Sequence, residues 1–565
     1  MSLPLSDQDK CWPSMVEKTD VNHEQINQQF DLDPADIAAH TPSLRGRKLT
    51  VAVAFVAGTG FTLLGYDQGV MSSLITGNQF EATFPEVVVE ASHPNHATLQ
   101  SFTIAIYEVG CLFGALSNLW VGDKLGRRKT IALAGSIMMI GAILQTTAFS
   151  FAHLIFARIF TGCGTGLITS TVPIYHAELS PSAKRGRMIM MEGTLIVFGV
   201  AIAYWIDLAL FFVNWSSAQW RVPISLQLVF EIIVVTCVGF LPESPRWLVK
   251  HGRNAEAMAV ISAMEDKPPS DPEVQRTYYG IREAVAVETS TSQGSLRELT
   301  TGGRSQNFRR TVIAVVCQMM QQLTGINLVT YYATIVFQRL GLSDVDARIT
   351  AAANGTEYFL ASFIAYYAID YVGRRQLMLI GAIGQSIVML LLAILGYINN
   401  GPAQIVSVVL LFGFNTFFAI GWLGMAWLYC AELVGLRIRA PTNALSTASN
   451  WTFNFVVVMV VGPSFNNISW RTYIVFAALN VAIIPVVYFF FPETGGRSLE
   501  DLDVMFALAH ITGEDPVKVS LRKDVPLAGS READEILGVS TGVQYHHTTK
   551  PATSFSLSSE ARTPV

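Results

Sequence analysis

Charged residues are scarce in this chain. They make up 14% of its 565 residues, whereas an average soluble domain has about a quarter. Hydrophobic residues make up 51% and are gathered into blocks, which indicates a chain built for a lipid bilayer. The net charge of -5 gives no basic surface of the kind that binds nucleic acid, so a nucleic-acid partner is excluded.

Paired cysteines and catalytic motifs are also lacking. The six cysteines have no paired spacing, and five of them lie inside apolar blocks, which argues against a disulfide framework and a zinc site. The polar segments contain no nucleophile, metal-binding set or phosphate loop, so we expect no enzyme activity, no metal and no cofactor. The segment up to Thr41 is polar and acidic, so we expect no cleavable signal peptide.

Twelve apolar stretches are long enough to cross a bilayer, which requires about 20 residues of helix. We therefore predict an all-α integral membrane protein with two six-helix bundles. The predicted spans are 49–75, 97–121, 130–150, 151–177, 187–210, 220–241, 310–338, 348–371, 376–399, 402–431, 440–464 and 470–491. The predicted divisions are a disordered cytoplasmic tail, 1–48, a first bundle, 49–241, an intracellular helical loop, 242–309, a second bundle, 310–491, and a cytoplasmic tail, 492–565, that is disordered from 510.

Basic residues in the short loops predict the orientation. Loops on one side hold eleven Lys and Arg residues, and loops on the other side hold four. Because positively charged loops stay in the cytoplasm, we expect a multi-pass plasma membrane protein with both termini cytoplasmic. The glycosylation sequons at Asn214 and Asn467 then face outward, and the sequence leaves their use open.

Three short motifs occur twice in the same order, 247 to 254 residues apart. They are Asp123-x-x-Gly126-Arg127-Arg128 with Asp370-x-x-Gly373-Arg374-Arg375, Glu178 and Arg185 with Glu432 and Arg439, and Pro242-Glu243-Ser244 with Pro492-Glu493-Thr494. This indicates two homologous halves, an architecture of transporters that expose a central site to each side in turn.

The repeated motifs lie at the predicted cytoplasmic ends of spans, where acids and bases of adjacent helices can pair. We expect such pairs to hold the two bundles together on the inside and to break when the inside opens. Arginines that only anchor the topology are the alternative, but topology does not require the accompanying acids. The predicted gate residues are Asp123, Arg127, Arg128, Glu178, Arg185, Glu243, Arg246, Asp370, Arg374, Arg375, Glu432 and Arg439.

Further stretches complete a resemblance to a known family. They are Arg158, Pro173-x-Tyr175-x-x-Glu178, Pro242-Glu243-Ser244-Pro245-Arg246, Gln321-Gln322-x-x-Gly325-x-Asn327, Asn450-Trp451-Thr452 and Pro492-Glu493-Thr494-Gly495-Gly496. Over roughly residues 50–500 the chain resembles the sugar porter family of the major facilitator superfamily. The stretches Gly65–Gly69, Tyr204–Asp207 and Asn354–Tyr358 resemble the fungal branch that contains proton–glycerol symporters together with hexose and pentose carriers.

Two ionisable residues inside spans indicate proton coupling. Asp67 and Arg158 lie at about the same depth, ~10–12 Å below the outer surface. A charge in mid-bilayer costs roughly 2.5–3.5 kcal/mol, so we expect the two to pair. Protonation of Asp67 would then release Arg158, and the resemblance implies the same role for this acid; a purely structural ion pair is the alternative. Glu108 and Glu231 are further mid-span acids that the sequence leaves without a role.

Adjacent amides in the seventh span indicate the solute site. Gln321 and Gln322 lie ~17 Å deep, and Gly325 can loosen the helix after them. Amides suit a sugar because each offers two donors and an acceptor, although glue between helices is the alternative. The resemblance implies solute binding by Gln321, Gln322, Asn327 and Asn450, an outer gate of Tyr331 and Tyr332, and packing from below by Trp427, for which core packing is the alternative. The chain departs from the family pattern at two places. Gly193, preceded by Glu192, stands where many relatives have a glutamine, and Glu357-Tyr358 stands where relatives often have an asparagine, so we expect Glu192 and Glu357 to reshape the pocket.

Together these features predict a proton-coupled importer that works as a monomer. Its solute would be small, neutral and polyhydroxy: a monosaccharide or polyol such as a hexose, a pentose or glycerol. A facilitative uniporter is an alternative, against which Asp67 argues. A transporter-like nutrient sensor is another, although the C-terminal tail of about 70 residues is short for such a role.

Overall fold

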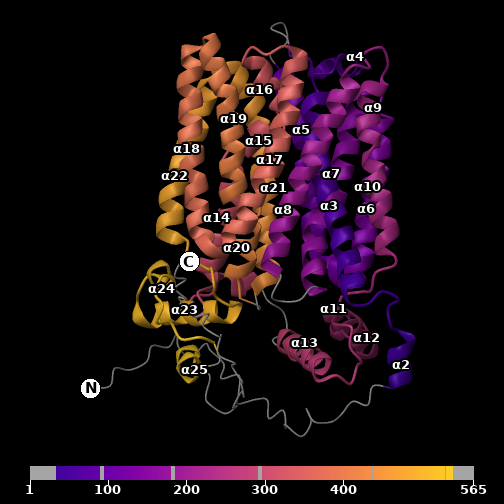
Figure 1. The fold of residues 1–565 in the computed structure, drawn as a ribbon, viewed down its shortest axis with the longest axis vertical. Helices are drawn as coiled ribbons and strands as arrows, with labels where there is room; N and C mark the ends of the chain where they lie inside the picture. The colour runs from indigo at the N-terminus through magenta and orange to yellow at the C-terminus, as the bar shows by residue number, and fades with distance from the viewer. Residues whose placement is uncertain are drawn as a thin grey trace, which may run out of the picture.

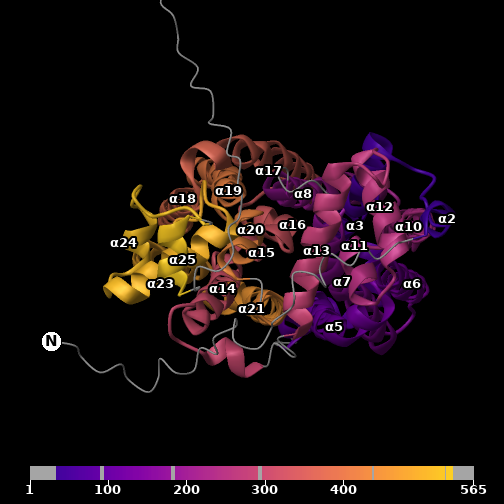
Figure 2. The same ribbon diagram turned by 90° about the horizontal axis from the view of Figure 1, so that it is seen from below.

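The computed structural model describes residues 33–89, 95–179, 185–290, 296–435, 438–528 and 530–538. Within these ranges the regular elements are helices (Figure 1). The long helices stand side by side in two groups (Figures 1 and 2). The first group is α3 (Gly46–Leu74), α5 (His96–Leu125), α6 (Arg127–Thr146), α7 (Phe151–Glu178), α8 (Arg185–Phe211), and α9 (Ala218–Ser225) continued by α10 (Gln227–Val238).

The second group repeats this plan with two interrupted spans. It is α14 (Asn307–Leu323) followed by α15 (Ile326–Thr330) and α16 (Ala333–Arg339), α17 (Asp344–Val372), α18 (Arg374–Ile398), α19 (Gly401–Gly421) followed by α20 (Met425–Leu433), α21 (Arg439–Ile468) and α22 (Arg471–Phe490). In the described ranges, eleven helical stretches are long and apolar enough to cross a membrane. The twelfth, α17, has 29 residues and packs along α8 and α19. The predicted all-α membrane fold with two six-helix bundles is confirmed.

The described part of the connection between the bundles contains the 3-10 helix η4 (Leu296–Thr300) and, before it, three α-helices at one end of the molecule. These are α11 (Pro245–Lys250), α12 (Asn254–Glu265) and α13 (Pro272–Ser290), at the bottom of Figure 1. We call this the α11 end. The opposite end carries α4 (Asn78–Thr83) and the short 3-10 helix η2 (Pro85–Val87), and we call it the α4 end.

Two segments that we expected to be disordered contain helices. In the N-terminal segment, α2 (Pro34–Ala39) packs against α12 and buries Ile37. After the second bundle come α23 (Leu499–Thr512), α24 (Pro516–Ser520) and α25 (Arg531–Leu537). Of these, α24 and α25 lie in the stretch from 510 that we predicted to be disordered; both are short helices, and the polarity averaged over the whole segment does not reveal them. Residues 1–32 and 539–565 lie outside the described residues.

Bare helix backbones meet where α5 crosses α7. Gly110 and Gly114 on α5 face Gly162 and Gly166 on α7. A Cβ atom at any of the four would lie 2.1 or 2.2 Å from a carbonyl oxygen of the other helix. Small residues spaced four apart allow this close packing inside a membrane. The crossing brings Arg158, one turn before Gly162, against the backbone of α5.

Candidate functional site

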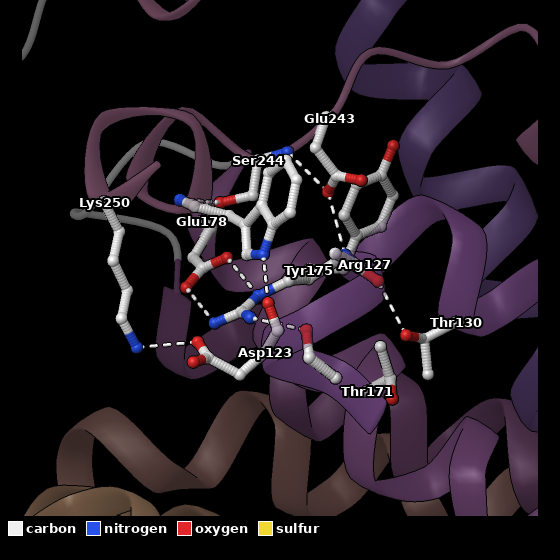
Figure 3. A network of polar contacts seen from close by, with 12 residues as sticks. Asp123, Arg127, Thr130, Thr171, Tyr175, Glu178, Glu243, Ser244 and Lys250 are labelled. Carbon is white, nitrogen blue, oxygen red and sulfur yellow. Dashed lines mark hydrogen bonds and ion pairs between the residues drawn. The ribbon is translucent and has the colours of Figure 1, made fainter. Parts of the chain in front are cut away.

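The first copy of the repeated motifs forms one connected network at the α11 end (Figure 3). Arg127 donates two hydrogen bonds to the carboxylate of Glu178, at 3.2 and 3.3 Å. Glu243 accepts from the backbone amides of Arg127, Arg128 and Ser244, the closest at 2.9 Å. Burial raises the pKa of Glu243, and these amides oppose the rise because they stabilise its charged form.

The second copy of the motifs forms the same network in the second bundle. Arg374 donates to the carboxylate of Glu432 at 3.1 and 2.8 Å, and its backbone amide donates to Glu493 at 2.9 Å. In each copy the arginine follows a glycine of positive φ, +83° at Gly126 and +91° at Gly373. The repeated motifs therefore mark a repeated structure.

These ion pairs lie within the halves and do not join them. Arg127 and Glu178 connect α6 to α7, and Arg374 and Glu432 connect α18 to α20. This differs from the expectation that the pairs hold one bundle to the other. Each arginine begins a helix beside the end of a neighbouring helix of its own bundle, so its partner lies there.

The other predicted gate residues are held at the same end. Asp123 pairs with Lys250 of α11 at 2.6 Å (Figure 3). Arg128, Arg375 and Arg439 donate to backbone carbonyls of their own halves. Arg246 lies on α11, and the side chains of Arg185 and Asp370 lie outside the described residues.

Hydrogen bonds join the two halves near the α4 end. The hydroxyls of Ser73 on α3 and Thr334 on α16 are 2.9 Å apart. The Tyr332 hydroxyl donates to the Ser101 hydroxyl of α5, also at 2.9 Å. Tyr331 reaches α5 as well, and both tyrosines, which we predicted to form the outer gate, are buried. The two halves are therefore fastened together on this side.

An ionisable cluster lies beside Tyr331. Asp67 of α3, Glu108 of α5 and Arg158 of α7 are 0% exposed. The Tyr331 hydroxyl donates to Oε1 of Glu108 at 2.5 Å. Among the described residues, none forms a hydrogen bond with either carboxylate oxygen of Asp67. Three helices of the first half thus bring two acids and one base together against a tyrosine of the second half.

The direct ion pair that we predicted between Asp67 and Arg158 is not formed. The Arg158 guanidinium donates to the carbonyl of Ile104 at 3.1 Å and to Oε1 of Gln145 at 3.5 Å, and it lies over the ring of Tyr107. The equal depth of Asp67 and Arg158 in the membrane places them near each other. It does not determine which acceptor the guanidinium faces. The glycine crossing of α5 and α7 puts the Ile104 carbonyl in that position. The charge of Arg158 nevertheless acts on Asp67.

The amides that we predicted to bind solute lie together in the second half. The amide of Asn450 donates to Oε1 of Gln321 and to Oε1 of Gln318, at 2.7 Å each. The amide of Asn327 donates to Gln322 at 2.6 Å and to Asn454 at 2.7 Å. We did not predict Gln318 and Asn454, although their spacing from two predicted residues could have identified them. Gln318 is three residues before Gln321 and Asn454 is four after Asn450, so each lies on the same helix face as a predicted residue.

Two helix breaks face each other at this cluster. The first follows Leu323, where Gly325 has a φ of +91° before α15 begins. The second separates α19 from α20, and there the amide of Gln321 donates to the carbonyls of Trp422 and Leu423 at 2.9 and 3.0 Å. Interrupted helices expose backbone polar groups to bound solutes in many transporters.

Two predicted pocket residues have neighbours that the sequence did not reveal. Trp427 is partly buried on α20, whereas Trp422, which we did not select, is fully buried beside Gln321. Glu192 forms a hydrogen bond with His176, whose Nδ1 lies 2.8 Å from Oε1 of Glu192. Both side chains are less than a tenth exposed. Glu192 therefore meets a buried histidine rather than standing alone.

Glu357 does not lie with the amides, which corrects the expectation that it shapes the pocket. It lines an open cavity of about 650 Å³ beside Trp205, Leu360 and Ile364, and Leu360 is 61% exposed. Its neighbour Tyr358 is buried. Because adjacent helical residues point in different directions, Glu357 turns to the outer, apolar face of the bundle. There it accepts a hydrogen bond from Thr416 at 2.5 Å.

Comparison with known proteins adds to this geometry. Residues 53–506 match the family model described as Sugar (and other) transporter. The Sugar transporter STL1 of Saccharomyces cerevisiae is 40% identical over 485 residues, which cover 84% of this chain and 84% of that protein. The MFS-type transporter oryC of Aspergillus oryzae is 38% identical over 503 residues, 87% of this chain and 92% of that protein.

A solved structure has the same fold. It is the proton:xylose symporter XylE from E. coli, bound to 6-bromo-6-deoxy-D-glucose. It superposes with a TM-score of 0.69 at 23% sequence identity and covers 81% of this chain and 99% of its own. At this identity the likeness supports the arrangement of the helices.

Proposed function

The chain belongs to the sugar transporter family of the major facilitator superfamily, and from this we propose that it imports a small neutral polyhydroxy solute together with protons. The solute is a monosaccharide or a polyol: a hexose, a pentose or glycerol. The protein works as a monomer in the plasma membrane, with both termini and the α11 end in the cytoplasm, in accordance with the loop charges.

The observation that carries this proposal is the buried amide cluster at the two helix breaks. The side chains of Gln321, Gln322, Asn327 and Asn450 bond to one another and to backbone carbonyls. Each amide has donors and an acceptor that can be exchanged for the hydroxyls of a solute. A neutral solute is favoured because these groups carry no net charge. The amides thus form a buried polar cluster in a membrane-spanning bundle.

Proton coupling is supported by Asp67. Its carboxyl is fully buried in a membrane helix and receives no hydrogen bond from the residues that the structure describes, so an ionised form is costly there. Binding a proton removes that cost. A proton that enters through a potential of 100 mV supplies about 2.3 kcal/mol, enough for a ~50-fold gradient of a neutral solute.

Transport requires the halves to separate at one end at a time. In this structure hydrogen bonds join them near the α4 end, through Ser73 with Thr334 and Ser101 with Tyr332. The ion pairs at the α11 end lie within each half, so opening that end would not break them. We propose that they keep each bundle rigid while it rocks against the other.

Uptake by purified protein in liposomes tests the proposal. Labelled glucose, xylose and glycerol are offered with and without an inwardly directed proton gradient, and with a protonophore. We expect gradient-driven accumulation of at least one of them. Uptake that does not respond to the gradient indicates a uniporter, and no uptake at all supports a sensor; either result contradicts the proposal.

A further inference from the structure

A hydrogen bond between the two halves ends on an acid that the proposed mechanism has not used. Oε1 of Glu108 on α5 accepts from the hydroxyl of Tyr331, between α15 and α16, at 2.5 Å. Both side chains are 0% exposed. The other carboxylate oxygen of Glu108 is without a hydrogen-bond partner in the described ranges of the chain. Glu108 is therefore sealed from water on the side where the halves meet.

Glu108 belongs to the same electrostatic cluster as Asp67. The ionisable groups that face it are Asp67 on α3, Arg158 on α7, Tyr331 in the second half, and Tyr107 and Cys111 on its own helix. The other long helices packed on α5 are α6 and α21. Their only ionisable residues are basic ones at their first turns, Arg127, Arg128, Lys129 and Arg439, at the α11 end.

The net charge of Asp67, Glu108 and Arg158 determines what closure of the α4 end requires. Two ionised carboxylates and one guanidinium carry a net charge of -1, which is costly in a dry site. One added proton makes the set neutral. Because one arginine cannot neutralise both Asp67 and Glu108, one of the two acids must take up a proton before the site is sealed. Glu231 on α10 is a third carboxyl near Asp67, and no hydrogen bond reaches it from the part of the chain that the structure describes, so it can only add to the negative charge of the cluster.

We propose that the transported proton is shared between Asp67 and Glu108, and that the contact of Glu108 with Tyr331 links its uptake to closure of the α4 end. This inference rests on the proposed proton-coupled transport. When the α4 end is open, water reaches Glu108 and both acids are ionised. One proton from outside neutralises the set, and Tyr331 then packs onto the neutral site. Release of the proton on the other side restores the charge and favours reopening.

The variant Glu108→Gln tests this arrangement in the full-length protein in liposomes. A glutamine still offers Tyr331 a carbonyl acceptor. The negative charge of Asp67 and the positive charge of Arg158 then cancel, so the cluster is neutral without an added proton. We expect gradient-driven accumulation to fall from tens of fold to about onefold, while solute exchange at equal concentrations stays within about threefold of the parent. A purely structural Glu108 predicts normal accumulation, and that result would overturn the inference.

Two further variants keep the test decisive. Glu108→Asp retains a carboxyl, so accumulation should persist, and its pH dependence should shift because the shorter side chain lies farther from Tyr331. If Glu108→Gln does not fold, an unshifted pH profile of Glu108→Asp contradicts the proposal by itself. Tyr331→Phe removes the link but keeps both acids, so accumulation should fall part of the way while some response to the gradient remains; unchanged accumulation would contradict the link. Absence of gradient-driven uptake in the parent protein would instead refute the proposed function.

Discussion

Arg348, near the start of α17, donates a hydrogen bond of 2.8 Å to the hydroxyl of Thr76, just beyond the end of α3. It also donates to the backbone carbonyl of Thr76 at 3.0 Å, and its guanidinium lies 3.9 Å from the centre of the Phe211 ring. Only 2% of Arg348 is exposed. With a further hydrogen bond of 3.4 Å to the carbonyl of Ser73, one side chain of the second half thus contacts four groups of the first half at the α4 end.

Replacing Arg348 by Ala should favour separation of the halves at this end. Loss of about 1 kcal/mol of hydrogen bonding raises the open population about fivefold. Labelling of a Thr334→Cys reporter by an impermeant maleimide, in a background without the native cysteines, measures the change. Arg471→Ala is the control, because Arg471 lies over Trp470 of its own half. Equal labelling of the two variants would show that Arg348 does not hold the gate.

Gly325 should not tolerate a side chain. Its φ of +91° is strained for other residues, and a Cβ atom would lie 2.7 Å from Cδ1 of Phe476. We expect Gly325→Ala to lower kcat/KM about tenfold, since a shifted Phe476 or a straightened helix moves Gln321 and Gln322. Gly413→Ala on α19 is the control, because nothing lies within 4 Å of its Cβ position. Normal uptake kinetics of Gly325→Ala would mean that the break is not needed.

Glu357→Gln should leave the KM for solute within about twofold. Its carboxyl faces the outer cavity with Leu360 and Ile364, away from the amide cluster. Gln322→Ala removes the acceptor of Asn327 and should raise KM about tenfold, as expected for a lost hydrogen bond to a buried group. Concentration-dependent uptake in liposomes compares the two. A tenfold rise in KM for Glu357→Gln would return that residue to the pocket.

Features that depend on local sequence were predicted well. The span 376–399 corresponds to α18, Arg374–Ile398, because apolar length and the preceding Gly373 mark a membrane helix and its start. The repeated motifs likewise predicted two related halves, and Gly325 predicted the break in the seventh span. Hydropathy and glycine conformation are both properties of short segments.

Features that depend on how helices are rotated and paired were not predictable. The sequence placed Glu357 in the pocket, but the direction of a side chain depends on the packing of the whole helix. It placed Asp67 and Arg158 at one depth, but the crossing of α5 with α7 gave the guanidinium a backbone acceptor at Ile104. The partner of Glu192 is His176, 16 residues earlier on another helix, and no spacing rule signals such a pair.

Losing one partner of the His176–Glu192 contact should destabilise the protein more than losing both. Each side chain is buried, so removing one leaves a polar group of the other without its hydrogen-bond partner, at a cost of about 1–3 kcal/mol. We expect His176→Leu and Glu192→Leu each to lower the thermal unfolding temperature in detergent. The double variant should unfold closer to the parent, because no unpaired polar group remains. Additive losses in the double variant would show that the two side chains are independent.

The helices after the second bundle should loosen in acid. Asp501 accepts from the backbone amides of Ser498 and Ala528 at 2.8 and 2.7 Å, and these bonds hold its pKa below the ordinary value of about 3.9. A lowered folded-state pKa stabilises the fold above that ordinary value, and the stabilisation is lost as the pH falls through the folded-state pKa.

Protection of α23 from hydrogen exchange should therefore be constant from pH 7 to 5 and fall below about pH 4, after correction for intrinsic exchange rates. Asp501→Asn should show reduced protection already at pH 7, because an amide side chain accepts the two bonds less strongly than a carboxylate. Glu500→Gln is the control, since Glu500 is exposed and lies next to Asp501 on the same helix. Equal protection of the two variants at pH 7 would show that the Asp501 carboxylate does not stabilise this segment.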